Sequence, residues 1–569
     1  MNSVPLLMLF FLVSSGIKVY SLHYDHTYTH ECLAKPMEPQ YAGGMVINPE
    51  LEHGLKGWTT FGQAKIEHQE SKDGNKYIVA SYRSGHCDSF SQKFYLEEEK
   101  LYVLSAWLQV SHGEAHLAAM FRTGITYQPA GWVIARQGCW SMLKGGIVVN
   151  SSGPVELFFQ ANNTRAEIWA DSISLQAFTQ EEWDSHQDQN IEKIRKGKVK
   201  FQVVDPQGRP LANAKISVKQ IKQTFPFGNA ISKFIIHKKA YQEWFVSRFK
   251  YAVFENEMKW YSNERRPGKE NYYDSDTMLK FAKRNNILVR GHNVLWDDPR
   301  YQPSWVKKLP RKDLQLATEK RINSVMKHYL GQLIHWDVVN ENLHFSFYEK
   351  RLGRNASTVF LKRAHQIDQK AIPFLNDYNT LESPTDSEST PAKYIEKIKL
   401  IREQGYHGPL GIGLEAHFDT PNLPYVRASL DMLASTKLPI WITELDVSHR
   451  PKQAMYLAQL IKEFHAHPAI HGIIMWGSWS PTGCWKMCFT DKNFNNLPTG
   501  NAVDNIMKVW RHEGLLGTTD GDGYFNTSLF HGDYKVEIRH STAVNSSKIR
   551  QFGVASSDKI QETHFKFHV

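Results

Sequence analysis

Two apolar stretches of this 569-residue chain each end at a glutamate. One covers residues 333–341 and ends at Glu341, and the other covers residues 439–444 and ends at Glu444. A buried strand of a parallel sheet is apolar on both faces, so a carboxylate is expected only at its end. A pair of carboxylates at strand ends is what acid–base and nucleophilic chemistry on a sugar bond requires. If both strands belong to one barrel, the two glutamates can face each other across a single cleft.

The elements that must position these glutamates belong to a region in which short apolar runs alternate with helical stretches. This alternation begins near residue 225 and predicts β/α units around a parallel sheet. Eight such units predict a closed (β/α)8 barrel, an α/β fold. The predicted strands are residues 225–229, 251–255, 287–292, 333–341, 372–377, 411–417, 439–444 and 473–476.

Most of these predicted strands end in a polar or aromatic residue. A single polar residue at a strand end would be an ordinary N-cap for the next helix. Polar or aromatic residues at corresponding ends of eight strands are not explained by capping alone. In a (β/α)8 barrel the carboxyl ends of the strands converge on one face, where the active site lies. The sequence therefore predicts a single site built from many strand ends.

The remaining segments read as β-structure. Residues 45–178 contain short alternating strands separated by Gly, Asn and Ser clusters, which predicts an N-terminal β-sandwich, jelly-roll-like in form. Residues 179–197 are polar and charged and fit a helical or extended linker. Residues 198–223 and 515–569 resemble the two halves of one small β-sandwich, with the barrel of residues 224–514 inserted between them.

The composition is that of a globular protein, with 41% hydrophobic and 22% charged residues. The net charge of +10 comes from dispersed Lys and Arg, many beside a glutamate, and no basic cluster is interleaved with aromatics. We therefore expect no nucleic-acid partner. The 16 Trp and 24 Tyr suit stacking on the C–H-rich faces of sugars.

The N-terminus has the features of a secretory signal peptide. Residues 6–13 form an apolar run too short to span a bilayer, and we place the signal peptide at residues 1–21. No other stretch is apolar enough for a membrane span, so we expect a secreted, extracellular or cell-wall protein with no membrane partner. Five glycosylation motifs agree with secretion, at Asn150, Asn162, Asn355, Asn526 and Asn545.

The chain has five cysteines, and this odd number leaves one thiol free or paired elsewhere. Cys484 and Cys488 are close enough in sequence to form a disulfide that closes one loop. Zinc binding is a poor alternative, because no second pair of Cys or His residues has ligand spacing.

Several of these segments resemble one known family. Residues 255–260, 290–296, 336–341 and 442–446 are similar to four motifs of family 10 glycoside hydrolases, the endo-β-1,4-xylanases. They occur in the right order on the right predicted strands, and the likeness covers about residues 225–512. Residues 341–345 and 483–488 resemble the plant branch of the family.

This resemblance implies a role for each candidate residue. Glu341 is the acid/base and Glu444 the nucleophile, with their carboxyl groups about 5–5.5 Å apart for a retaining reaction. Asn340 hydrogen-bonds the 2-hydroxyl of the sugar, His417 orients Glu444, and Asp446 supports His417. The residues implied to bind substrate are Glu255, Asn256, Lys259, His292, Trp296, Tyr378, Trp476 and Trp485.

Other residues of these motifs have a structural interpretation. Trp336 and Trp441 are expected to pack inside the barrel wall, and Asp337 is as readily a structural hydrogen-bond acceptor. Two positions depart from the pattern of many bacterial and fungal members, with Asp297 in place of His and Glu415 in place of Gln. Both departures change the local charge, which bears on the pH optimum more than on the type of reaction.

The N-terminal region resembles family 22 carbohydrate-binding modules. The segments that carry this likeness are residues 47–58, 82–88, 102–107 and 171–175. The resemblance makes Tyr82, Arg83 and Tyr127 candidate ligand contacts, whereas Trp58 and Trp107 are expected in the core.

Together these features predict a secreted, monomeric, retaining endo-β-1,4-xylanase that cleaves internal bonds of cell-wall xylan by double displacement. No cofactor and no metal are needed, because two carboxylates carry the reaction. One alternative is a xylan endotransglycosylase, which uses the same residues but passes the glycosyl group to another sugar. The other is a catalytically silent xylan-binding wall protein, from which some of Glu341, Glu444, Asn340 and His417 would be expected to be lost.

Overall fold

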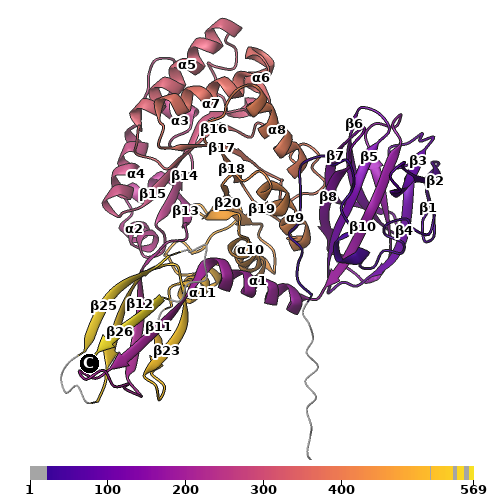
Figure 1. Cartoon of the computed structure of the whole chain (residues 1–569). Coiled ribbons are helices and arrows are strands. Elements are labelled where there is room, and N and C mark those ends of the chain that lie inside the picture. Colours follow the sequence, from indigo (N-terminus) through magenta and orange to yellow (C-terminus); the bar gives the residue numbers. More distant parts are fainter. Residues whose placement is uncertain (1–21, 513, 542–546, 556–562) are drawn as a thin grey trace, which may run out of the picture.

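The computed structural model describes residues 22–569, except residue 513 and segments 542–546 and 556–562. The expected signal peptide and Asn545 therefore lie outside the described residues. Figure 1 shows three parts: an N-terminal sandwich, a central barrel, and a small sandwich that combines segments from both sides of the barrel.

The central part is a closed parallel barrel, as the sequence predicted. Hydrogen bonds between β13 and β21 close the ring, and the sixth predicted strand is split into β18 and β19. The strands are β13 (Phe227–Ile231), β14 (Tyr251–Phe254), β15 (Leu288–Trp296), β16 (His335–Asn340), β17 (Ile372–Asp377), β18 (Gly411–Leu414), β19 (His417–Phe418), β20 (Ile440–Val447) and β21 (Ile470–Met475).

Helices cover the outside of the barrel (Figure 1). The sequence marks several of their starts: Thr390 and Asn422 accept N-cap hydrogen bonds, and a proline occupies the first turn after each. The helices are α2 (Lys239–Val246), α3 (Trp260–Asn263), α4 (Tyr273–Arg284), α5 (Arg311–His328), α6 (Phe347–Leu352), α7 (Ala356–Ile367), α8 (Pro391–Glu403), α9 (Leu423–Ala434), α10 (Gln453–Ala466) and α11 (Pro498–Trp510).

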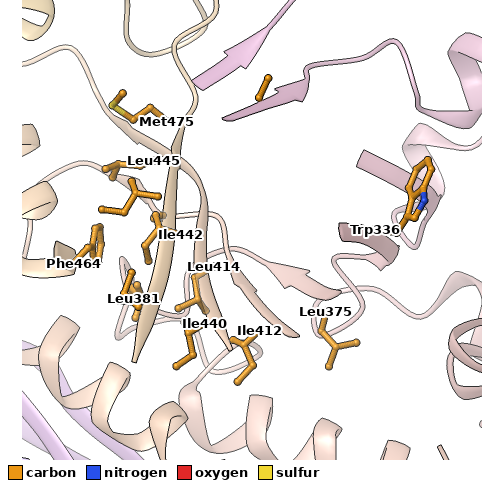
Figure 2. Packing of buried hydrophobic residues seen from close by; sticks show 14 of the residues in the cluster. Trp336, Leu375, Leu381, Ile412, Leu414, Ile440, Ile442, Leu445, Phe464 and Met475 are labelled. Atoms are coloured by element: carbon orange, nitrogen blue, oxygen red, sulfur yellow. The ribbon is translucent and has the colours of Figure 1, made fainter. Parts of the chain in front are cut away.

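The barrel core lies between the strands and these helices. Figure 2 shows strand residues such as Ile440, Ile442 and Leu445 in one cluster with Phe464 of α10. These strand side chains are fully buried, which explains why the strands are nearly continuous apolar runs. Buried charged groups within the strands have partners, as Arg290 of β15 has in Asp337 of β16.

The N-terminal part is an antiparallel sandwich in which strands far apart in sequence are neighbours. Its sheet order is β1-β4-β9-β6-β7-β8-β5-β10-β3-β2, and Trp58 and Trp107 are buried in its cores. The strands are β1 (Thr59–Phe61), β2 (Lys65–Glu70), β3 (Lys76–Ser81), β4 (Ser89–Leu96), β5 (Leu101–Val110), β6 (Glu114–Thr123), β7 (Thr126–Arg136), β8 (Ser141–Ile147), β9 (Gly153–Ala161) and β10 (Ile168–Phe178).

The small sandwich joins the two segments that flank the barrel. Strand β11 (Lys196–Val204) pairs with β23 (Tyr524–Phe530) and β26 (Thr563–His568). Strand β12 (Lys215–Gln223) pairs with β22 (Leu515–Thr518) and with β24 (Gly532–Arg539), which pairs in turn with β25 (Lys548–Val554). The two segments thus share both sheets, and the barrel is inserted between them.

The connection between the N-terminal sandwich and the rest is a packed helix, α1 (Gln180–Arg195). Thr179 and Glu182 form a capping box at its start. Trp183 is fully buried and donates from Nε1 to Glu463 of α10 (2.9 Å). The predicted linker is therefore helical and is fixed to the barrel.

The cysteines form two disulfides, Cys484–Cys488 and Cys32–Cys139. The sequence argument singled out only the first, because the second joins residues that are 107 positions apart. Cys87 is left as the free thiol. Among the described residues, no helix has the length and apolar character needed to cross a bilayer.

Candidate active site

Glu341 and Glu444 both lie at the carboxyl end of the barrel strands. Glu341 follows β16 directly and has a φ of 57°, a left-handed conformation that is uncommon for a residue with a side chain. Its N–H donates to the carbonyl of Asn376 (2.8 Å), which fixes the turn. Glu444 lies within β20, and both side chains are buried.

The side-chain amide of Asn376 forms hydrogen bonds to three polar side chains of this site. The side-chain NH2 of Asn376 donates to Glu444 (3.1 Å), Glu415 (3.1 Å) and the side-chain oxygen of Asn340 (3.0 Å). The bond to Asn340 uses that residue's amide oxygen and leaves its NH2 group as a donor toward a ligand. Asn376 therefore orients three neighbouring side chains from the end of β17.

A histidine lies between two of these carboxyl groups. Nε2 of His417 is 3.7 Å from Glu444 and 3.5 Å from Glu415, and Nδ1 is 3.0 Å from Asp446. Although burial disfavours its charge, Asp446, Glu415 and Glu444 raise the pKa of His417 well above its ordinary value. The structure thus places the imidazole of His417 beside the carboxyl groups of Glu415 and Glu444.

A second histidine approaches Glu444 from β15. Nε2 of His292 is 3.8 Å from Glu444, and its Nδ1 donates to Asp337 (2.9 Å). Arg290 donates to the other oxygen of Asp337 (2.8 Å), and all three residues are buried. Asp337 therefore has the structural role considered from sequence, and it fixes the orientation of His292.

These surroundings shift the pKa values of Glu341 and Glu444 in opposite directions. Burial, followed by the negative charge of Asp377, raises the pKa of Glu341. Burial acts in the same direction on Glu444, but His292, His417 and Lys259 outweigh it and lower the pKa of that carboxyl. Near neutral pH, Glu341 is the group that retains a proton and Glu444 is the one that is ionised.

A cavity of about 700 Å³ opens beside this centre. Four predicted substrate-binding residues line it: Glu255, Asn256, Trp476 and Trp485. The ammonium of Lys259 lies near two of the predicted aromatic residues, with Nζ 5.8 Å from the ring of Trp476 and 4.4 Å from that of Trp296.

The aromatic side chains around the cleft are braced by neighbouring rings. Trp296 stacks on Tyr301 with ring centroids 4.0 Å apart, and Tyr378 stacks on His344 at 3.8 Å. These contacts fix the orientation of both predicted residues. Trp485 belongs to the loop closed by Cys484–Cys488, is 67% exposed, and meets His417 edge-on at 5.1 Å.

The tryptophans assigned to packing are indeed buried. Trp336 is in the main core, and Trp441 packs with Phe374 and His335 in a cluster inside the barrel. Burial also raises the pKa of Asp297 to about 7, so this departure from the family pattern adds less negative charge than an ordinary carboxylate.

The structure corrects one of the three candidates in the N-terminal sandwich. Arg83 is buried, and its guanidinium donates to five backbone carbonyls, of Asp88, Asn163, Ala166, His86 and Ala161. Because a guanidinium has five N–H donors, none is left for a ligand. Tyr82 and Tyr127 are exposed, at 82% and 52%, and remain candidates.

Within the described part of the chain, two groups of side chains have the composition of metal ligands. They are Glu415, His417 and Glu444 in the cleft, and His26, Asp431 and His467 between the sandwich and the barrel. In the cleft group, the raised pKa of His417 favours a positive charge on its ring, opposite the two carboxylates. In the other group, the ammonium of Lys144 lies 2.7 Å from Asp431 and provides the positive charge.

Sequence reasoning overlooked Asn376 and Arg290 as parts of this site. Asn376 lies near the end of a predicted strand, and this position could have identified it as a site residue. Arg290 is a charged residue within the buried strand β15, two positions before His292. Such a residue is buried only with a partner, and that partner is Asp337.

The fold and the site together define a class: a (β/α)8-barrel enzyme with one protonated and one ionised glutamate facing a cleft lined with aromatic residues. The profile described as Glycosyl hydrolase family 10 matches residues 217–505. The chain belongs to this family.

Similar proteins are known from plants and bacteria. Endo-1,4-beta-xylanase 5-like of Arabidopsis thaliana is 39% identical over 96% of this chain and 96% of its own length. Endo-1,4-beta-xylanase 5 of the same plant is 38% identical over 95% of this chain and 94% of its own length. The crystal structure of native xylanase 10B from Thermotoga maritima is 26% identical, covers 51% of this chain and 97% of its own, and has a TM-score of 0.46.

Proposed function

We propose that this protein is a secreted endo-β-1,4-xylanase that hydrolyses internal bonds of xylan with retention of configuration. The observation that carries the proposal is the opposite electrostatic setting of Glu341 and Glu444 within one cleft. The likeness to plant endo-1,4-beta-xylanases over nearly the whole chain supports the choice of substrate.

In the proposed reaction Glu444 attacks the anomeric carbon while Glu341 donates its proton to the departing sugar oxygen. When Glu444 has formed the glycosyl ester its negative charge is lost, so the pKa of Glu341 falls and it becomes a base for the incoming water. Asn340 hydrogen-bonds the 2-hydroxyl of the sugar. His417, supported by Asp446, orients the carboxylate of Glu444 toward the anomeric carbon.

The N-terminal sandwich is proposed to bind xylan next to the catalytic cleft. Its exposed Tyr82 borders a cavity of about 730 Å³ that also includes Lys65 and Glu67. Secretion is supported by the two disulfides and by the exposure of four glycosylation motifs, at Asn150, Asn162, Asn355 and Asn526.

The function is tested by measuring the reducing ends released from soluble glucuronoxylan by wild type, Glu444→Gln and Glu341→Gln. We expect both variants to lose at least about a hundredfold in rate, because each removes one of two essential groups. Equal release by wild type and Glu444→Gln would overturn the assignment. A labelled xylo-oligosaccharide acceptor added to the wild-type reaction distinguishes hydrolysis from transglycosylation, because only transfer incorporates the label.

A further inference from the structure

The outer end of the active-site cavity carries a group of basic side chains that the proposed reaction does not use. Arg265, Arg266 and Lys269 line the cavity and are exposed. They belong to the loop between α3 and α4. None of the three forms an ion pair within the part of the chain that the structure describes.

This loop is held rigidly. Its base is closed by the N–H of Asn271, which donates to the carbonyl of Asn263 (2.7 Å). Inside it, the buried carboxylate of Glu264 accepts from Trp260 Nε1 (2.9 Å) and from the N–H of Gly268 (2.6 Å). A preformed loop presents its cations with little ordering cost on binding.

Among the described residues, the acidic side chains of the same cavity form no ion pair with these cations, because they have other partners or positions. Both carboxylate oxygens of Glu257 accept backbone N–H groups, from Lys233 (2.9 Å) and Asn256 (3.1 Å). Glu255 accepts from the hydroxyl of Ser478 (2.7 Å). Asp274 lies in the first turn of α4, where the helix dipole favours a negative charge. Lys233 adds a fourth exposed cation to the lining.

The same cavity also contains Trp476 and Trp485, whose rings are surfaces for sugars. A chain of sugars bound along these rings therefore shares the cavity with Arg265, Arg266 and Lys269. Guanidinium groups bind carboxylates through two parallel hydrogen bonds, whereas a neutral sugar offers them no charge.

We propose that Arg265, Arg266 and Lys269 form a subsite for the carboxylate of a uronic-acid side group on the polysaccharide. This inference rests on the proposed function and specifies its substrate as an acidic, uronic-acid-decorated xylan. The subsite selects among substrates and takes no part in bond cleavage.

The test compares two polymers with the same backbone and the same decorated positions. One is glucuronoxylan, and the other is the same preparation after chemical reduction of its carboxyl groups to alcohols. At about 20 mM NaCl, where charges are weakly screened, we expect wild-type kcat/KM to be about threefold to tenfold higher on the acidic polymer. At about 300 mM NaCl this preference should shrink.

The triple variant Arg265→Gln/Arg266→Gln/Lys269→Gln is expected to cut both polymers equally, at the wild-type rate for the reduced one. A matched control, Arg284→Gln/Lys308→Gln/Lys312→Gln, removes three exposed charges outside the cavity and should keep the preference. Activity on the reduced polymer also shows that each variant is folded.

Equal wild-type activity on the two polymers, or a triple variant that retains the preference, would overturn the subsite. Failure of the proposed function gives a different result, because wild type would then release reducing ends from neither polymer. The single variants Arg265→Gln and Arg266→Gln provide the same comparison if the triple variant does not fold.

Discussion

At the scale of single residues, the site depends on how its carboxyl groups are partnered. Glu341 is surrounded by apolar burial and by Asp377, whereas Glu444 is surrounded by Asn376, His292 and His417. Two chemically identical side chains therefore have opposite protonation states. The sequence placed both glutamates at strand ends, but the partners that separate them come from other strands.

The first prediction concerns pH. Activity needs protonated Glu341 and is lost as pH rises through its raised pKa. Asp377→Asn removes the negative charge that raises the pKa of Glu341 most, so this pKa should fall and the basic limb of the kcat/KM profile should move to lower pH, by about half a unit to one unit. The measurement is a pH–rate profile on xylo-oligosaccharides, with Asp313→Asn, an exposed carboxylate of α5, as the control. An unchanged limb, or one displaced to higher pH, contradicts this assignment.

The second prediction concerns Asn376, which donates to Glu444, Glu415 and Asn340. Asn376→Ala should lower kcat about tenfold to a thousandfold with little change in KM, because the groups that it orients act mainly in the transition state. Steady-state kinetics provide the test. A variant that loses affinity and retains kcat would show that Asn376 only binds substrate.

At the scale of elements, strands were predicted correctly where both of their faces are buried. All eight barrel strands were recognised, because burial on both faces makes them apolar and their polar ends stand out. In the N-terminal sandwich five strands were recognised, near β3, β5, β6, β9 and β10, whereas β1, β2, β4, β7 and β8 were missed. Strand β2 is largely polar, and β7 contains Pro129 and Gly131. Arg83 was misassigned because sequence does not show that backbone carbonyls surround it.

The third prediction concerns the loop that carries Trp485. The disulfide Cys484–Cys488 closes a loop of only a few residues, so it contributes little to global stability, but it holds Trp485 beside His417. Cys484→Ser/Cys488→Ser should change the melting temperature by no more than about 2 °C and raise KM for xylan severalfold. Differential scanning calorimetry and kinetics measure the two effects. An unchanged KM would mean that Trp485 does not need this constraint.

At the scale of the whole molecule, buried charges join the N-terminal sandwich to the barrel. Lys144 of β8 is fully buried and donates to Asp431 of α9 (2.7 Å), which also accepts from the hydroxyl of Tyr24 (2.8 Å). Lys144 and Asp431 are 287 positions apart, so no local sequence signal connects them. The sequence predicted both domains but not that they are fixed to each other.

The fourth prediction tests this connection. Lys144→Met removes one partner of a buried ion pair and should destabilise the protein by about 3 kcal/mol, because Asp431 is left buried with less compensation. Lys100→Met breaks the exposed pair with Glu97 and should leave the stability almost unchanged, because water screens that pair. Calorimetric unfolding of both variants provides the comparison, and equal effects would show that the buried pair does not hold the two parts together.

In the proposed reaction Glu444 forms a covalent bond to the sugar, while Glu341 first donates and then accepts a proton. A 2-fluoro-xylobioside with an activated leaving group slows release of the glycosyl-enzyme, which intact mass and peptide mapping then detect. We expect one 2-fluoro-xylobiosyl group per protein, bound to Glu444, and none on Glu444→Gln. A label on any other residue, or turnover of the compound without a covalent adduct, would contradict it.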